Sequence, residues 1–190
     1  MNPEINTFAV VLAAGESKRL GRAKALLNCG EKTLIKFIVD RLESINLKVI
    51  VITNLELEKS IIEALELNDA KVIVPENTEY RTGNLIAGLN AIKNPEKILV
   101  VPVDRPGWSL DTVKKLINVD FTCCPEFQGK GGHPLLICKT DLEKLSKSSV
   151  DTPLNTIFTT KRINVLDTYL HLNIDTPDDL LILKKFINEI

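Results

Sequence analysis

Residues 7–24 read TFAVVLAAGESKRLGRAK, and the organisation of the rest of the chain follows from this stretch. Its first part, Phe8–Leu12, is continuously apolar, which predicts a strand buried on both faces. Three residues with almost no side chain come next, Ala13-Ala14-Gly15, and then four cations: Lys18, Arg19, Arg22 and Lys24. Small residues leave backbone N–H groups accessible and cations neutralise negative charge, so the loop is suited to hold a polyphosphate. The alternative is an ordinary strand-to-helix turn with solvated basic side chains.

The loop differs from two well-known phosphate-binding loops. Gly21 is followed by Arg22-Ala23-Lys24 rather than by Lys and Ser or Thr, which excludes the Walker-type loop. The stretch also has no G-x-G-x-x-G pattern, which excludes the dinucleotide-binding fingerprint.

Apolar strand patterns and amphipathic helix patterns alternate along the first part of the chain. Strands are expected at 48–53, 71–74 and 97–103, and helices at 32–44, 55–67, 84–92 and 110–117. This alternation predicts an α/β fold with a mostly parallel sheet and right-handed crossovers.

The second half has a different pattern. Two strand-like segments, 119–124 and 134–138, follow each other without a helix between them, which predicts a small antiparallel excursion. Further helices are expected at 140–147 and 152–160, and a strand pair at 162–166 and 170–174. The closing helix is expected over 180–190, with Thr176 as its N-cap and Pro177 in its first turn. Because no linker or repeat is visible, we expect one domain over residues 1–190.

Composition narrows the class of protein. The chain has 190 residues, 44% of them hydrophobic, and a net charge of −1, so no bulk polyanion partner is expected. Aromatic residues make up only 5%, which argues against a nucleic-acid partner that stacks on exposed bases. No signal segment or long apolar run is present, so we expect a cytoplasmic protein with no membrane partner. The cysteines form no C-x-x-C pair and are expected to be free thiols: Cys29, Cys123, Cys124 and Cys138.

A carboxylate follows the most apolar strand directly. Asp104 ends the run VVPVD and precedes Arg105-Pro106. In an open parallel sheet, ligands bind outside the carboxyl ends of the strands, where the basic loop also lies. Asp104 is therefore a candidate Mg²⁺ ligand, and the alternative is a turn or capping aspartate.

The pattern L-A-A-G-x-S-x-R-x-G-x-x-K at Leu12–Lys24 resembles the signature loop of the nucleotidyltransferases related to molybdenum cofactor cytidylyl- and guanylyltransferases. Four later segments are similar to the same family, in the family's order: 77–85, Asp104-Arg105-Pro106, 130–136 and 173–180. The chain departs from the family pattern at Thr78, at the serines absent from 85–88, and at Asn173. The resemblance implies a Rossmann-like three-layer α/β domain.

The resemblance also implies site residues. Catalysis would fall on Arg19, Lys24 and Asp104, and Mg²⁺, or alternatively Mn²⁺, on Asp104 and Asp175. Acceptor contacts would fall on Gly131, Gly132 and His133, although His133 taken alone is typical of a turn, and Arg81 is either a substrate clamp or a solvated side chain. Nucleotide contacts would fall on Leu12, Ala13, Ala14, Gly15, Ser17, Arg19, Lys24, Asn77, Gly83 and Asn84.

The implied reaction is metal-dependent transfer of a nucleotidyl group from a nucleoside triphosphate to a phosphate-bearing small molecule, with release of pyrophosphate. Ala14-Gly15, where GTP-using relatives tend to have Gly-Gly, favours CTP and hence molybdopterin cofactor as acceptor. The alternatives are a GTP-dependent guanylyltransferase, a nucleotidyltransferase for a sugar phosphate or methylerythritol phosphate, and a non-catalytic nucleotide-binding accessory protein. We expect a monomer or weak dimer, with a transient contact to a molybdoenzyme or another acceptor protein as a further hypothesis.

Overall fold

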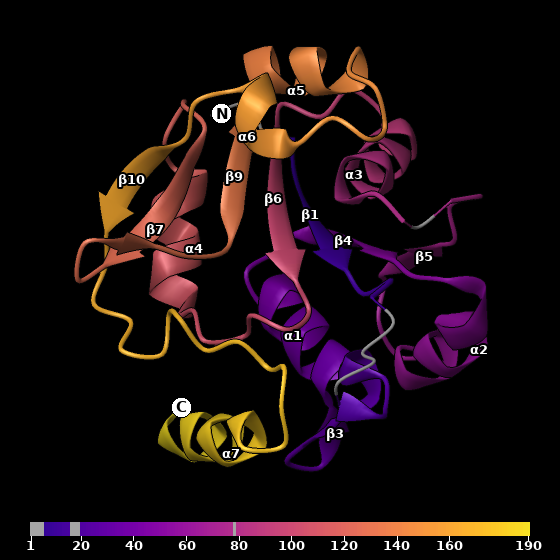
Figure 1. Cartoon of the computed structure of the whole chain (residues 1–190), viewed down its shortest axis with the longest axis vertical. Coiled ribbons are helices and arrows are strands. Elements are labelled where there is room, and N and C mark those ends of the chain that lie inside the picture. The colour runs from indigo at the N-terminus through magenta and orange to yellow at the C-terminus, as the bar shows by residue number, and fades with distance from the viewer. Residues whose placement is uncertain (1–5, 16–19, 78) are drawn as a thin grey trace.

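A central β-sheet with helices on both faces makes up the architecture of the computed structural model, which describes residues 6–15, 20–77 and 79–190 (Figure 1). The strand order across the sheet is β10-β7-β9-β6-β1-β4-β5, with β8 paired to β7. The strands of this sheet are β1 (Thr7–Leu12), β4 (Lys48–Ile52), β5 (Lys71–Ile73), β6 (Lys97–Pro102), β7 (Cys123–Phe127), β8 (Lys130–Gly131), β9 (Leu135–Cys138) and β10 (Lys161–Asn164). A separate small hairpin joins β2 (Asn28–Cys29) to β3 (Lys32–Thr33).

The sheet is parallel on one side and mixed on the other. β1 pairs in parallel with both β4 and β6, and β4 pairs in parallel with β5. β9 then pairs antiparallel to both β6 and β7, whereas β10 is parallel to β7. The expected mostly parallel α/β sheet with an antiparallel excursion is confirmed.

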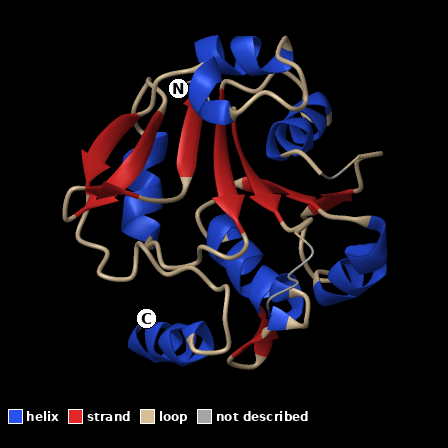
Figure 2. Cartoon of the chain, in the orientation of Figure 1, coloured by secondary structure: helices blue, strands red, loops and turns tan. Residues whose placement is uncertain are grey.

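The helices form two layers, as the blue ribbons on either side of the red sheet in Figure 2 show. They are α1 (Leu34–Glu43), α2 (Leu55–Ala64), α3 (Arg81–Asn90), α4 (Leu110–Ile117), α5 (Lys139–Ser146), α6 (Leu154–Ile157) and α7 (Asp179–Glu189), with a short 3₁₀ helix η2 (Lys24–Leu26). Within the described ranges, none of these helices combines the length and the apolarity that crossing a membrane would require.

β1 shows why the apolar run at the start of the chain is continuous. Ala9 and Val11 belong to the core cluster shared with α1, α4 and α7, while Val10 belongs to the cluster shared with α3 and α5. All three side chains are fully buried. Because alternate residues of a strand point to opposite faces, a strand covered on both sides must be apolar throughout.

Several predicted boundaries were wrong in the second half. The segment 119–124 becomes a strand only from Cys123 onward, and the helix predicted at 152–160 is limited to Leu154–Ile157 because Phe158 is extended. The segment 170–174 is not a strand, so the pairing predicted with 162–166 does not form. Its N–H groups go elsewhere: Leu172 donates to the Tyr169 carbonyl and Ile174 to the Asp104 carbonyl.

The start of the last helix also differs from the prediction. The helix begins at Asp179, and the Thr176 hydroxyl donates to the Asp179 carboxylate instead of accepting from a helix N–H. Asp179 Oδ2 also accepts hydrogen bonds from the backbone N–H groups of Asp175 and Thr176, at 2.9 and 2.7 Å. The carboxylate thus satisfies donors that precede the helix.

Candidate active site

A cavity of about 220 Å³ opens at the carboxyl ends of β1 and β6. It is lined by three segments that are distant in the sequence: Leu12, Ala13, Ala14, Gly15, Lys24 and Ala25; Glu79, Arg81 and Asn84; and Pro102, Val103 and Asp104. Parallel strands bring their carboxyl ends to one edge of a sheet, which is why these segments meet. The sheet-edge site expected from the sequence is therefore a cavity built from the expected segments.

The backbone pairing of β1 continues for one residue beyond its end, into the small-residue loop. Ala13 donates its N–H to the Ile52 carbonyl at 2.8 Å, and Val103 donates to the Leu12 carbonyl at 3.0 Å. Asn54 donates to the Ala14 carbonyl at 3.2 Å while its Oδ1 caps α2 through the Leu57 N–H. These bonds fix the wall of the cavity on the side of the opening loop.

One lysine joins the two carboxylates predicted to bind metal. Lys24 Nζ lies 3.1 Å from Asp104 Oδ2 and 2.6 Å from Asp175 Oδ1. The side chains of Lys24, Asp104 and Asp175 are only 14%, 30% and 21% exposed, so water screens the three charges weakly. Lys24 is predicted to hold the triphosphate, and in the structure its ammonium group is paired with both carboxylates.

The donor set of these two carboxylates suits a hard divalent cation. Oxygen atoms of Asp104 and Asp175 approach one cationic nitrogen within 3.1 Å, so both side chains are aimed at a shared point of positive charge. Mg²⁺ is typically bound by one or two carboxylates, with substrate phosphates and water completing its shell. In the part of the chain that the structure describes, no group of three or more His, Cys, Asp or Glu residues could hold a metal, so the protein would offer this pair.

The backbone around the two carboxylates is held by further contacts. The Ile174 N–H donates to the Asp104 carbonyl at 2.9 Å, which ties the two loops together. Asn173 Nδ2 donates to Asp175 Oδ2 at 2.5 Å. Asp179 fixes the Asp175 backbone, and hydrogen bonds from the N–H groups of Asp175 and Thr176 lower the pKa of the Asp179 carboxyl. This role of Asp179 was not predicted from the sequence, although an aspartate four residues after Asp175 is the available signal.

His133 lies close to the same edge. Burial, together with the charges of Arg81 and Arg105, lowers the pKa of His133 to about 4, against a smaller opposing effect of Asp104. The imidazole is therefore neutral near pH 7. Its Nδ1 is buried and has no hydrogen-bond partner among the described residues.

The predicted acceptor glycines are packed against protein. A Cβ on Gly132 would lie 2.6 Å from Leu170 Cγ, and one on Gly131 would lie 3.4 Å from Cys124 Sγ. Neither residue lines the cavity at Lys24 and Asp104. Close packing therefore accounts for the glycine at position 132, whereas the contact at Gly131 is an ordinary van der Waals distance.

Of three predicted nucleotide contacts, Asn84 lines the cavity in the structure, whereas Asn77 and Gly83 do not. Asn84 is buried and lines the cavity, whereas Asn77 is exposed and accepts a hydrogen bond from the Glu79 N–H. Gly83 faces away from the cavity, toward Val150, whose carbonyl accepts its N–H at 3.0 Å. Ser17 and Arg19 lie outside the described residues. Glu79 also lines the cavity, a residue that sequence reasoning missed although it lies within the segment noted at 77–85.

The family model of the MobA-like NTP transferase domain matches residues 9–165, which include every strand of the main sheet except the first two residues of β1. This chain belongs to the MobA-like NTP transferase family. The predicted membership of the nucleotidyltransferases is thereby confirmed, and this MobA-like protein is an enzyme of that class. The matched segment stops before Asp175 and α7.

Individual relatives of this chain are also named as nucleotidyltransferases. The molybdenum cofactor cytidylyltransferase of Escherichia coli (strain K12) is 22% identical over 188 residues, which cover 95% of this chain and 97% of the relative. A probable molybdenum cofactor guanylyltransferase of Bacillus mycoides (strain KBAB4) is 27% identical over 114 residues, covering 57% of this chain and 54% of the relative. The structure of Rv0371C in complex with manganese, from Mycobacterium tuberculosis H37Rv, has the same fold, with a TM-score of 0.73, 20% identity, and coverage of 95% of this chain and 98% of that one.

Proposed function

We propose that this MobA-like protein transfers the cytidylyl group of CTP to the phosphate of molybdopterin cofactor and releases pyrophosphate. The observation that carries the proposal is the convergence of Lys24, Asp104 and Asp175 beside the cavity at the carboxyl ends of β1 and β6. Such a cluster supplies a cation and two metal-binding carboxylates next to a concave space, as phosphoryl-group chemistry requires.

In this mechanism an oxygen of the acceptor phosphate attacks the α-phosphorus of the nucleotide. A new P–O bond forms as the bond to the bridging oxygen of the β-phosphate breaks, and pyrophosphate leaves with that electron pair. Asp104 and Asp175 would hold Mg²⁺ or Mn²⁺, which when bound supplies positive charge against the α-phosphate.

The other residues of the site bind and orient. The ammonium group of Lys24 would neutralise phosphate charge on the side of the opening loop, and the backbone of Ala13-Ala14-Gly15, which lines the cavity, would face the nucleotide. Arg81, which lines the cavity, and the neutral His133 would contact the acceptor. Because the acceptor phosphate is itself the nucleophile, no Ser, Cys or His nucleophile is needed, and positioning and charge neutralisation carry the catalysis. Arg19, predicted to bind the triphosphate, stays a prediction.

The choice of CTP over GTP is supported by two observations. The loop has Ala14 before Gly15, and the wall at Ala14 is fixed by Asn54. The cytidylyltransferase relative aligns with 95% of this chain, while the guanylyltransferase relative aligns with 57%. GTP remains the second candidate because a relative named as a probable molybdenum cofactor guanylyltransferase aligns with 57% of this chain.

A nucleotide panel tests the proposal. Thermal unfolding would be followed with CTP, GTP, ATP and UTP, each with and without Mg²⁺ or Mn²⁺, together with pyrophosphate release when molybdopterin cofactor is added. A ligand at 100 times its dissociation constant adds about 2.7 kcal/mol to stability, so binding is easily detected. We expect a metal-dependent shift with CTP and pyrophosphate release only with acceptor.

Two matched variants make the panel specific. Asp104→Asn should lose the metal-dependent shift, whereas Asp111→Asn, at a carboxylate 95% exposed on α4, should keep it. A shift with GTP alone would replace the substrate assignment. A shift that needs no metal, without turnover, would instead indicate a nucleotide-binding accessory protein.

A further inference from the structure

The side chain of Arg41, on α1, contacts the loop that follows Asp104. Its guanidinium donates one hydrogen bond to the Pro106 carbonyl at 3.2 Å and another to the Trp108 carbonyl. A guanidinium can serve two diverging acceptors at once because its donors are held in a rigid planar fork. The loop from Asp104 to Ser109 is thus attached to α1 by one side chain.

The same guanidinium lies among three aromatic rings. Its Cζ is 4.0 Å from the centroid of Trp108, 5.1 Å from that of Phe37 and 5.7 Å from that of Phe186. Trp108 and Phe186 are almost fully buried, so these cation–π contacts are shielded from water. Burial lowers the pKa of Arg41 to about 10, which leaves the group charged near pH 7. Phe186 belongs to α7, the helix that follows Asp175, so Arg41 contacts both carboxylate-bearing regions.

These two regions are also attached to each other. The Ser109 N–H donates to Asp167 Oδ2 at 2.9 Å, and the Ile174 N–H donates to the Asp104 carbonyl at 2.9 Å. A Cβ on Gly107 would lie 1.9 Å from the Tyr169 carbonyl oxygen, so the two backbones are in direct contact there.

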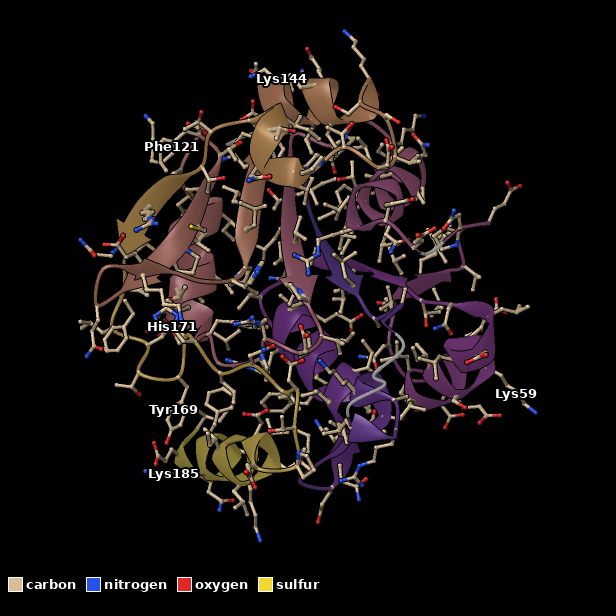
Figure 3. All side chains as sticks on the ribbon, in the orientation of Figure 1. Lys59, Phe121, Lys144, Tyr169, His171 and Lys185 are labelled. Carbon is tan, nitrogen blue, oxygen red and sulfur yellow. The ribbon has the colours of Figure 1, made fainter. Side chains whose placement is uncertain are left out.

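Tyr169 continues this contact toward the last helix. Its side chain points toward α7 (Figure 3), and its ring lies 5.3 Å from that of Phe186. A displacement of one loop must therefore move the other.

We infer that Arg41 is a positioning residue that sets the relative placement of Asp104 and Asp175. It would act through the Pro106 and Trp108 carbonyls on one side and through Phe186 on the other. The inference rests on the proposed function, because it takes the two carboxylates as the metal ligands. Residues that orient metal ligands commonly change metal affinity about 10- to 100-fold when they are replaced.

The test compares Mn²⁺ affinity, measured by electron paramagnetic resonance without substrate, in the full-length wild type, Arg41→Lys and Arg41→Met. Arg41→Lys keeps the charge and most of the stem but loses the fork, so it remains informative even if Arg41→Met does not fold. The control is Lys97→Met. Lys97 is also buried, and its ammonium group donates to the Ile117 carbonyl at 3.1 Å and pairs with Asp120 at 2.7 Å. It is the first residue of β6, at the end of the strand opposite Asp104.

We expect Mn²⁺ affinity to fall about 10-fold or more in the folded Arg41→Lys protein. Lys97→Met should keep wild-type affinity even where it lowers the melting temperature more. CTP affinity measured without metal should change little in Arg41→Lys. Wild-type Mn²⁺ affinity in folded Arg41→Lys would overturn the positioning role alone, whereas a wild-type protein that binds no Mn²⁺ would remove the proposed metal site and the positioning role together.

Discussion

Replacement of Lys24 by methionine should destabilise the protein and make its melting temperature respond more strongly to a divalent metal ion. Breaking a fully buried ion pair by removing one partner costs about 3–5 kcal/mol, and losing an exposed pair costs up to about 1 kcal/mol. The three side chains of the Lys24 cluster are 14–30% exposed, which lies between these cases. We therefore expect Lys24→Met to lower the free energy of unfolding by about 2 kcal/mol, or the melting temperature by about 4–8 °C for a protein of this size.

Metal should reverse much of this loss. In the wild type a divalent cation must compete with the ammonium group for the oxygens of Asp104 and Asp175, whereas in Lys24→Met those oxygens lack that cation. Differential scanning calorimetry with and without Mn²⁺ would measure the effect. Mn²⁺ should raise the melting temperature of Lys24→Met more than that of the wild type.

The matched control is Lys36→Met. Lys36 is similarly buried, at 24% exposed, and lies 3.3 Å from Asp40, but Asp40 keeps Lys32 as a second partner. This variant should lose about 1 kcal/mol or less and respond to Mn²⁺ as the wild type does. Equal Mn²⁺ responses in all three proteins, or a Lys24→Met protein as stable as the wild type, would refute the reasoning.

Three other predictions follow from single contacts. Asp104→Asn should keep the fold, by circular dichroism, but lower the rate of pyrophosphate release about 10²- to 10³-fold. The pKa of His133 is lowered to about 4 from an ordinary value of 6.5, so between these pH values the unfolded chain binds more protons than the folded protein. The free energy of unfolding should therefore rise with pH across that window, by about 1.4 kcal/mol per pH unit. Chemical denaturation of His133→Gln should show a weaker dependence of stability on pH. Gly107→Ala should lower stability by about 1–3 kcal/mol in urea titrations, because the added methyl group would overlap the Tyr169 carbonyl oxygen, while Gly15→Ala, whose added Cβ would meet nothing within 4 Å and whose φ is not positive, serves as the open-space control.

Much of the parallel half of the fold could be predicted because its signals are local. The centre of the apolar run, Ala9–Val11, is buried on both faces, and the amphipathic pattern of α1 repeats at helical spacing. Asp104 could be singled out because it comes directly after a buried strand, and strand ends are where such sheets bind ligands. These inferences needed only the period of the pattern and the sheet rule.

The remaining features depend on contacts between distant residues. The segment 170–174 has a strand-like composition, but its Leu170 and Leu172 N–H groups bond within a local turn, to the Asp167 and Tyr169 carbonyls. The Ile174 N–H reaches a distant residue, Asp104, so turn bonds and one tertiary contact replace strand pairing. The resemblance to the family predicts ligand contacts at Gly132 and Gly83, and it carries no sign of their close protein neighbours, Leu170 and Val150. The pairing of Lys24 with carboxylates 80 and 151 positions away has no local signature at all.

The most direct test of the account is the position of the metal. Crystals grown with CTP and MnCl₂, and measured for manganese anomalous scattering, should show one peak coordinated by Asp104 and Asp175, with Lys24 Nζ moved away from the two carboxylates. A peak elsewhere, with Lys24 still bonded to both side chains beside bound CTP, would contradict the assignment of this pair as the metal site.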